Sequence, residues 1–210
     1  MKQLISTIIL GFVLISCSAH KGEETKKETQ IKTIGMDTIT LGAGCFWCVE
    51  AIFQDIKGVE SVVSGYSNGA VKNPSYKEVC TGTTGHAEVC QLVYNPEIVS
   101  LAKILEVFWQ THDPTTLNRQ GADTGTQYRS GIFYHTEEQK EIATDIFNKL
   151  DDAGAFKDPI VTEITEVTDF YPAEDYHQDY FDINGTQPYC TAVIRPKVEK
   201  FKKAFSDILK

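Results

Sequence analysis

Apolar positions alternate, cluster or recur at helical spacing along most of residues 37–210, and they predict interleaved strands and helices. Strands are expected where apolar runs end at turn residues, over 37–44, 59–66, 87–94, 130–135 and 160–167. Helices are expected where apolar residues recur every three or four positions, over 45–57, 100–111, 136–154, 173–182 and 196–209. This order lacks the regular repeats of a doubly wound fold. We therefore expect an α/β (α+β) two-layer sandwich, with helices packed on a mixed sheet.

Two polar segments interrupt this pattern. Residues 67–85 are rich in Gly, Asn, Pro and Thr, and residues 112–128 are also polar. Both are expected to be long loops, and long loops in compact domains usually carry function. Strand 87–94 alternates so that Glu88 shares one face with apolar neighbours, which predicts that its side chain points inward.

The N-terminal segment has a different pattern. An apolar run over 5–15 follows Lys2, and it is too short to span a membrane, so residues 1–16 are expected to be a signal peptide. The run ends in Leu-Ile-Ser-Cys at 14–17, which resembles a bacterial lipobox in which Cys17 becomes the lipidated first residue. The alternative is a plain secretory signal that ends near residues 18–19.

Residues 17–36 have the polar composition of a flexible tether, so the catalytic domain is expected over 37–210. A lipid on Cys17 would hold the chain to a membrane surface without spanning it. We therefore expect an extracytoplasmic, membrane-anchored lipoprotein of a bacterial cell envelope or periplasm.

Composition narrows the choice of function. The chain has 210 residues, of which 41% are hydrophobic, enough for one domain with a substantial core. Its formal net charge of -9 argues against nonspecific nucleic-acid binding. We expect a monomer.

The Cys45-x-x-Cys48 pair allows three interpretations. Structural zinc needs four ligands, and because this Cys-x-x-Cys pair has no second pair, no metal site is expected. A thioredoxin-like dithiol fits the count, although Phe46 and Trp47 are large for its interior positions. In the third interpretation Cys45 is a single nucleophile, because it follows a Gly-Ala-Gly turn and begins a helix whose N-terminus would lower the thiol pKa. A buried, inert Cys45 is the alternative to this.

Four ordered blocks resemble the A-type peptide methionine sulfoxide reductases. They are "GCFWCVE" at 44–50, "NPSYKEVCTGTTGHAEV" at 73–89, "HDPTTLNRQGADTGTQYRSGIF" at 112–133 and "FYPAEDYHQDYF" at 170–181. The resemblance implies the ferredoxin-like plait of that family and reduction of methionine S-sulfoxide, free or in oxidised proteins, as repair of oxidative damage. It implies no cofactor, only an external thioredoxin-like thiol reductant.

The resemblance also implies residue roles. Cys45 would attack the sulfoxide sulfur, and Glu88 would be the acid, which needs a pKa raised by burial. Substrate would bind to the remaining matched residues, which are Phe46 and Trp47 as an apolar pocket, Tyr76 and Tyr128 as hydroxyl donors, and Asp123. Without the resemblance, Glu88 could be an exposed carboxylate and Asp123 a turn residue. Phe46 and Trp47 could be core residues, and Tyr76 and Tyr128 half-buried surface rings.

Cys45 would become a sulfenic acid. A second, resolving thiol must then condense with it to form a disulfide. Cys190 occupies the place where this family usually carries that thiol, and the residues at 184–185, Asn-Gly, would give it freedom to approach. The family's glycine-rich tail is absent, however, and Cys48 stands where many members have Gly. Cys48 is therefore the alternative resolving residue. Cys80 and Cys90 are expected to be packed interior thiols.

Two other functions compete with the enzyme. One is a secreted thiol-disulfide carrier that uses Cys45 and Cys48, and the other is a surface-tethered binding module. A carrier needs no acid, so Glu88 discriminates between the carrier and the enzyme.

Overall fold

The structure is a computed structural model that describes residues 35–210. The signal peptide expected over 1–16, the lipidation site at Cys17 and residues 18–34 of the tether lie outside the described residues.

A six-stranded mixed sheet forms the centre of the domain. Its strands run in the order β7-β6-β1-β3-β2-β8, and only β6 and β7 pair in parallel. The bounds are β1 Asp37–Ala43, β2 Val59–Ser67, β3 Ala87–Tyr94, β6 Ser130–Tyr134, β7 Glu163–Glu166 and β8 Phe170–Pro172.

The four central strands form a ferredoxin-like plait. Helix α1 (Phe46–Phe53) connects β1 to β2, and α3 (Leu101–Thr111) lies between β3 and β6. The resulting spatial order β6-β1-β3-β2 is that of two interlocked strand–helix–strand units. The predicted fold class, helices packed on a mixed sheet, is confirmed.

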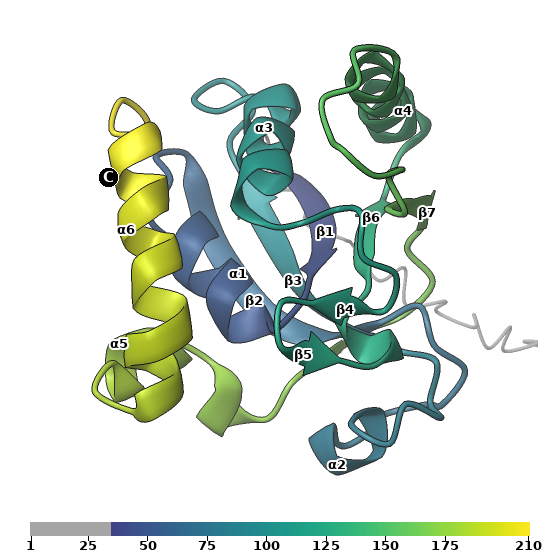
Figure 1. The fold of residues 1–210 in the computed structure, drawn as a ribbon, viewed down its shortest axis with the longest axis vertical. Coiled ribbons are helices and arrows are strands. Elements are labelled where there is room, and N and C mark those ends of the chain that lie inside the picture. The colour runs from purple at the N-terminus through teal and green to yellow at the C-terminus, as the bar shows by residue number, and fades with distance from the viewer. Residues whose placement is uncertain (1–34) are drawn as a thin grey trace, which may run out of the picture. The chain divides into compact units, whose positions relative to one another are not determined.

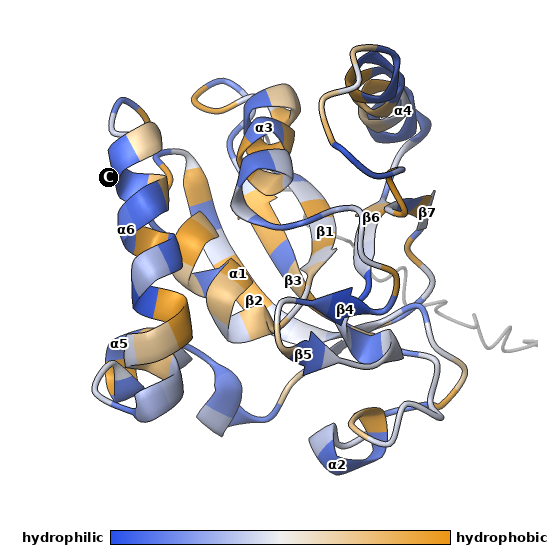
Figure 2. Cartoon of the chain, viewed as in Figure 1, coloured by the Kyte–Doolittle hydropathy of each residue, from blue (hydrophilic) through white to orange (hydrophobic). Residues whose placement is uncertain are grey.

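The helices enclose the main core on one face of the sheet (Figure 1). Helix α6 (Arg195–Ala204) packs beside α1, and α4 (Glu137–Asp152) packs near β6 and β7. Figure 2 shows α1 as almost entirely apolar, and every residue of it except Trp47 is buried. Strand β3 alternates as predicted, with Glu88, Cys90 and Leu92 on one face, while Val89 joins a small cluster on the other face.

Two predicted loops contain regular structure. In 67–85, helix α2 (Tyr76–Val79) begins at a capping box in which Ser75 and Glu78 exchange hydrogen bonds. In 112–128, the hairpin of β4 (Arg119–Gln120) and β5 (Asp123–Thr124) precedes a 3-10 turn, η1 (Thr126–Tyr128).

Three predicted helices differ from the structure. The helix expected over 173–182 is split into η2 (Asp175–His177) and α5 (Tyr180–Asn184), because Asp179 has a left-handed backbone with φ 51°. The helix expected over 45–57 ends at Phe53, and the C-terminal one ends at Ala204. A short π-helix, η3 (Cys190–Ile194), leads directly into α6.

Candidate active site

A glycine turn places Cys45 at the start of α1. Gly44 has φ +88°, and a Cβ there would lie 2.5 Å from Cβ of Gln120, so a larger residue is excluded by backbone and space. Cys45 then takes the N-cap position of α1, but its side chain makes no capping hydrogen bond. The turn therefore directs the Cys45 thiol toward the interior, where only 8% of the residue is exposed.

Glu88 supplies the carboxyl group of the site. It comes from β3, is 1% exposed, and its Oε2 accepts from the backbone N–H of Phe46 at 3.1 Å. Burial raises the pKa of Glu88 to about 8, although the hydrogen bond from Phe46 opposes the shift. A carboxyl with this pKa is protonated at neutral pH and can give a proton to an oxygen.

The expectation of a lowered pKa for Cys45 is wrong. Burial raises the pKa of this thiol, and so do its hydrogen bond to Cys48 and the charge of Glu88. The physical reason is burial, which disfavours the thiolate, and the start of α1 does not offset it because the first N–H of the helix donates to Glu88. Cys45 thus stays a thiol until a substrate or a base takes part.

Aromatic rings surround the site. The buried Phe46 ring lies 5.0 Å from the ring of His177 and 5.9 Å from that of Tyr66. Trp47 stacks on Tyr180 with centroids 3.6 Å apart, and its Nε1 donates to Nδ1 of His177 at 3.2 Å. One face and the Nε1 edge of the indole are therefore held in one orientation, as a binding surface requires.

The two predicted hydroxyl donors are half-buried near Glu88. Burial raises the pKa of Tyr76 and of Tyr128, and the Glu88 charge adds to each shift. Both phenols therefore stay protonated and can donate. The Tyr76 ring is stacked with Phe46, its centroid 6.4 Å away.

Asp123 is linked to the site by Tyr189, a residue to which the sequence assigned no role. The Tyr189 hydroxyl donates to Oδ2 of Asp123 at 2.7 Å, and the same residue acts to lower the pKa of the Cys45 thiol. The only signal for Tyr189 was its position beside Cys190. Tyr66, His177 and Tyr180 were likewise not assigned binding roles, because their convergence depends on tertiary packing.

The remaining thiols differ in their placement. Cys48 is 3% exposed and lies one helical turn from Cys45, and the two thiols shift each other's pKa, that of Cys45 upward and that of Cys48 downward. Cys190 is fully buried in the core under η3. Cys90 is buried as predicted, whereas Cys80 is exposed, so the expectation of an interior Cys80 is wrong. It is the C-cap of α2, which stands outside the sheet core.

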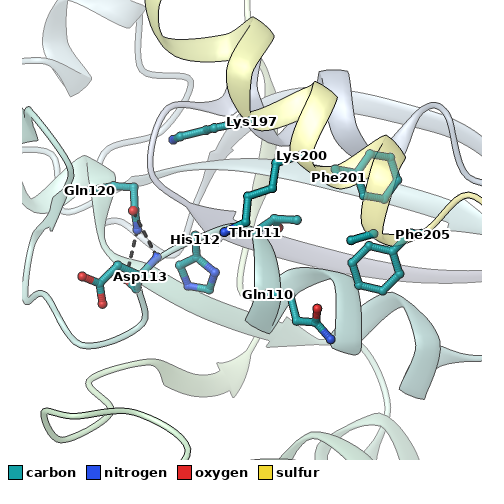
Figure 3. A pocket seen from close by; sticks show the side chains of 10 residues that line it. Gln110, Thr111, His112, Asp113, Gln120, Lys197, Lys200, Phe201 and Phe205 are labelled. Atoms are coloured by element: carbon teal, nitrogen blue, oxygen red, sulfur yellow. Dashed lines mark hydrogen bonds between the residues drawn. The ribbon is translucent and has the colours of Figure 1, made fainter.

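A separate pocket of about 320 Å³ lies beside this site (Figure 3). It opens between the end of α3, Gln120 and α6, and Figure 3 shows Lys197 and Lys200 entering it from α6. None of the predicted substrate-binding residues lines it. Residues 35–210 hold no group of three or more His, Cys, Asp or Glu side chains placed to bind a metal. Across the same range, no helix is both long and apolar enough to cross a membrane.

Comparison with known proteins identifies the family. The model of the family "Peptide methionine sulfoxide reductase" matches residues 37–209. The chain belongs to this family. A peptide methionine sulfoxide reductase MsrA of Trichodesmium erythraeum is 54% identical over 172 residues, which are 82% of this chain and 97% of the relative. The activity of this chain is thus the reduction of methionine S-sulfoxide to methionine.

Solved structures agree with this assignment. Mxr1 from Saccharomyces cerevisiae in reduced form superposes with a TM-score of 0.70 at 37% identity, covering 75% of this chain and 90% of that one. The structure of Mxr1 in complex with Trx2 gives a TM-score of 0.52 at 26% identity, covering 73% and 91%.

Proposed function

We propose that Cys45 is the nucleophile and Glu88 the acid of the reductase reaction. The observation that carries this is the hydrogen bond that ties the protonated Glu88 carboxyl to the helix beginning at Cys45. Glu88 protonates the sulfoxide oxygen while the Cys45 sulfur bonds to the sulfoxide sulfur. The hydroxyl group then moves to the Cys45 sulfur as the S–O bond and the new S–S bond break, which releases methionine and leaves a sulfenic acid on Cys45. The Cys45 thiol proton returns to the Glu88 carboxylate, so one thiol and one sulfoxide give one sulfenic acid and one methionine.

The aromatic residues beside Cys45 form the binding surface for the substrate. Trp47, held by Tyr180 and His177, and Phe46 offer an apolar surface for the sulfoxide methyl group. Tyr76 and Tyr128 supply hydroxyl donors for the sulfoxide oxygen. Asp123, held by Tyr189, is the further polar contact on this side of the thiol.

Cys48 is the better placed resolving thiol. Cys45 is the N-cap of α1 and Cys48 lies in its first turn, so the two thiols shift each other's pKa, whereas Cys190 belongs to the separate element η3. A bridge from Cys45 to Cys48 spans one helical turn, so only α1 has to adjust. We therefore favour Cys48 over Cys190, which the sequence favoured.

Single turnover without reductant tests both the reaction and the resolving residue. The wild-type chain mixed with a methionine S-sulfoxide peptide should release one methionine per enzyme and form a Cys45–Cys48 disulfide. Cys48→Ser should still release one methionine but leave a sulfenic acid that dimedone traps on Cys45. Peptide mapping by mass spectrometry reads the bridge. A Cys45–Cys190 bridge in the wild type would contradict our choice, and no methionine at all would contradict the mechanism.

A thioredoxin-like protein is the proposed reductant. Support comes from the fold shared with Mxr1, for which a structure in complex with Trx2 is known. The disulfide would be reduced by dithiol exchange, which returns both cysteines to thiols and needs no bound cofactor.

We also propose that Cys17 is lipidated and that the chain is anchored to a membrane surface outside the cytoplasm. The support is the lipobox-like sequence at 14–17 and the polar segment that separates it from β1. In cells, Cys17→Ser should move the protein from the membrane fraction to the soluble fraction, because its only lipid is lost. Fractionation with immunoblotting measures this, with Cys80→Ser as the matched thiol control. Membrane association that survived Cys17→Ser would rule out the anchor.

A further inference from the structure

Lys197 makes a contact that the reaction described so far does not use. It comes from α6, 149 positions along the chain from Cys48, yet its Nζ lies 3.8 Å from the Cys48 sulfur. The ion pairs found within residues 35–210 do not include Lys197. Its side chain is half-buried and lines the pocket in Figure 3, and its ammonium donates a hydrogen bond to the Cys48 sulfur.

We propose that Lys197 is a catalytic residue of the second step, in which its ammonium activates the Cys48 sulfur to displace hydroxide from the Cys45 sulfenic acid. This rests on the proposed function, in which Cys48 is the resolving residue. It makes the C-terminal helix a part of the reaction centre through one direct contact with a reacting atom.

The chemistry of the step requires an activated sulfur. The Cys48 thiolate attacks the Cys45 sulfur, an S–S bond forms and the S–O bond breaks. The Cys48 sulfur is oxidised, the Cys45 sulfur is reduced, and the leaving hydroxide takes a proton from the Glu88 carboxyl and departs as water. The rate rises with the fraction of Cys48 that is ionised, which a nearby cation increases.

The groups around Cys48 favour its ionised form. The hydrogen bond from Cys45 lowers the pKa of Cys48 most, burial opposes the shift, and the Lys197 charge lowers the pKa further. Asp123 on β5 raises it, and the Tyr189 hydroxyl lowers it. Once Cys45 carries a sulfenic acid, its original thiol contact is gone, and Lys197 is then the main group that stabilises the Cys48 anion.

The other titratable neighbours do not compete for this role. Glu88 on β3 is protonated at neutral pH, and burial raises the pKa of Cys190, so both are neutral there. Beyond Lys197, His112 is also neutral because burial lowers its pKa to about 4. Asp113 is the carboxylate that faces Lys197 across the pocket, yet no ion pair joins the two.

Rapid-quench single turnovers of the full chain separate the two steps. Methionine release reports the attack by Cys45, and loss of free thiols reports the resolution by Cys48. Lys197→Met keeps the length of the side chain and removes its charge, and Lys197→Arg keeps a charge. Lys200→Met is the matched control, because it removes a lysine of the same helix and pocket that has no contact with Cys48.

Lys197→Met should slow thiol loss at pH 7 about three- to tenfold. The rate falls because less of Cys48 is ionised without the Lys197 charge, and the greater nucleophilicity of a more basic thiolate offsets part of this loss. The rate should recover as pH rises, Lys197→Arg should restore it, and methionine release should stay within about twofold of wild type. Lys200→Met should behave as wild type.

Three results would overturn the proposal. One is thiol loss in Lys197→Met that matches wild type at every pH, and the other is an equal loss in both steps, which would indicate a structural role. Lys200→Met that slowed thiol loss as much as Lys197→Met would also overturn it. A wild-type disulfide that included Cys190, or no methionine release, would instead refute the proposed function, and this inference with it.

Discussion

Cys45→Ser is expected to reduce methionine release to background, at least a 10³-fold loss, because a serine hydroxyl is a far weaker nucleophile than a thiol and cannot form a sulfenic acid. The substitution is nearly isosteric, and it leaves the glycine turn and the Glu88 hydrogen bond to Phe46 in place. Single-turnover release of methionine from a sulfoxide peptide, followed by chromatography, measures the effect.

The control for this substitution is another buried thiol. Cys90→Ala removes a sulfur from the neighbouring strand β3, where Cys90 contacts the backbone carbonyl of Phe46 but faces no substrate group. It should keep the first-step rate within a few-fold of wild type and lower stability only slightly. If Cys45→Ser still released methionine at the wild-type rate, the nucleophile would have to be another residue.

The sequence predicted the strand and the turn that hold Glu88 and Cys45, because neighbouring residues determine both. A strict period of two in 87–94 predicted that Glu88 faces inward, and it is 1% exposed. The Gly-Ala-Gly turn predicted a sharp entry into a helix, and Gly44 has φ +88°. The sequence also held a signal that we did not use, because Ser75 and Glu78 have the spacing of a capping box and begin α2.

The features of the site that the sequence did not predict depend on contacts between residues far apart in the chain. The raised pKa of Cys45 comes mainly from burial by the tertiary packing, with a contribution from the charge of Glu88 on β3, which also accepts from the first N–H of α1 from 42 positions away. Tyr189 meets Asp123 from 66 positions away, and no periodicity links the two. Likewise, nothing local indicated that Lys197 would reach Cys48.

Glu50 belongs to the same segment, 44–50, as Cys45, and it holds the aromatic residues beside that thiol in place. It is buried one turn after Phe46, and burial raises its pKa to about 7. Its Oε1 accepts from the Ser64 hydroxyl and its Oε2 accepts from the backbone N–H of Tyr180, each at 3.2 Å. Since Tyr180 stacks on Trp47, helix α1 positions its own aromatic residue through a contact with α5. The structural role of this carboxylate was not visible in the sequence.

Glu88→Gln should slow methionine release about 10²- to 10⁴-fold, the usual contribution of a general acid. The amide carbonyl can still accept from the Phe46 N–H, so the fold of the site is kept while the proton is lost. The wild-type rate should fall as pH rises above about 8, because Glu88 then ionises and can no longer donate. Glu88→Gln should lack that fall. Single-turnover rates from pH 6 to pH 10 test both expectations, and a wild-type rate that stayed flat through pH 8 would contradict the role of Glu88 as acid.

The same substitution should stabilise the fold, which separates loss of catalysis from loss of structure. Glu88 ionises near pH 4.3 in the unfolded chain but near pH 8 in the folded one, so between these values the folded state binds more protons and stability falls as pH rises. Glu88→Gln removes this penalty and should raise the free energy of unfolding by on the order of 4 kcal/mol at pH 8, with little change at pH 4. Urea unfolding at the two pH values measures this, with exposed Glu60→Gln on β2 as the charge-matched control. A catalytically inactive variant that is more stable than wild type at pH 8 would show that the buried carboxyl is kept for its proton and not for the fold.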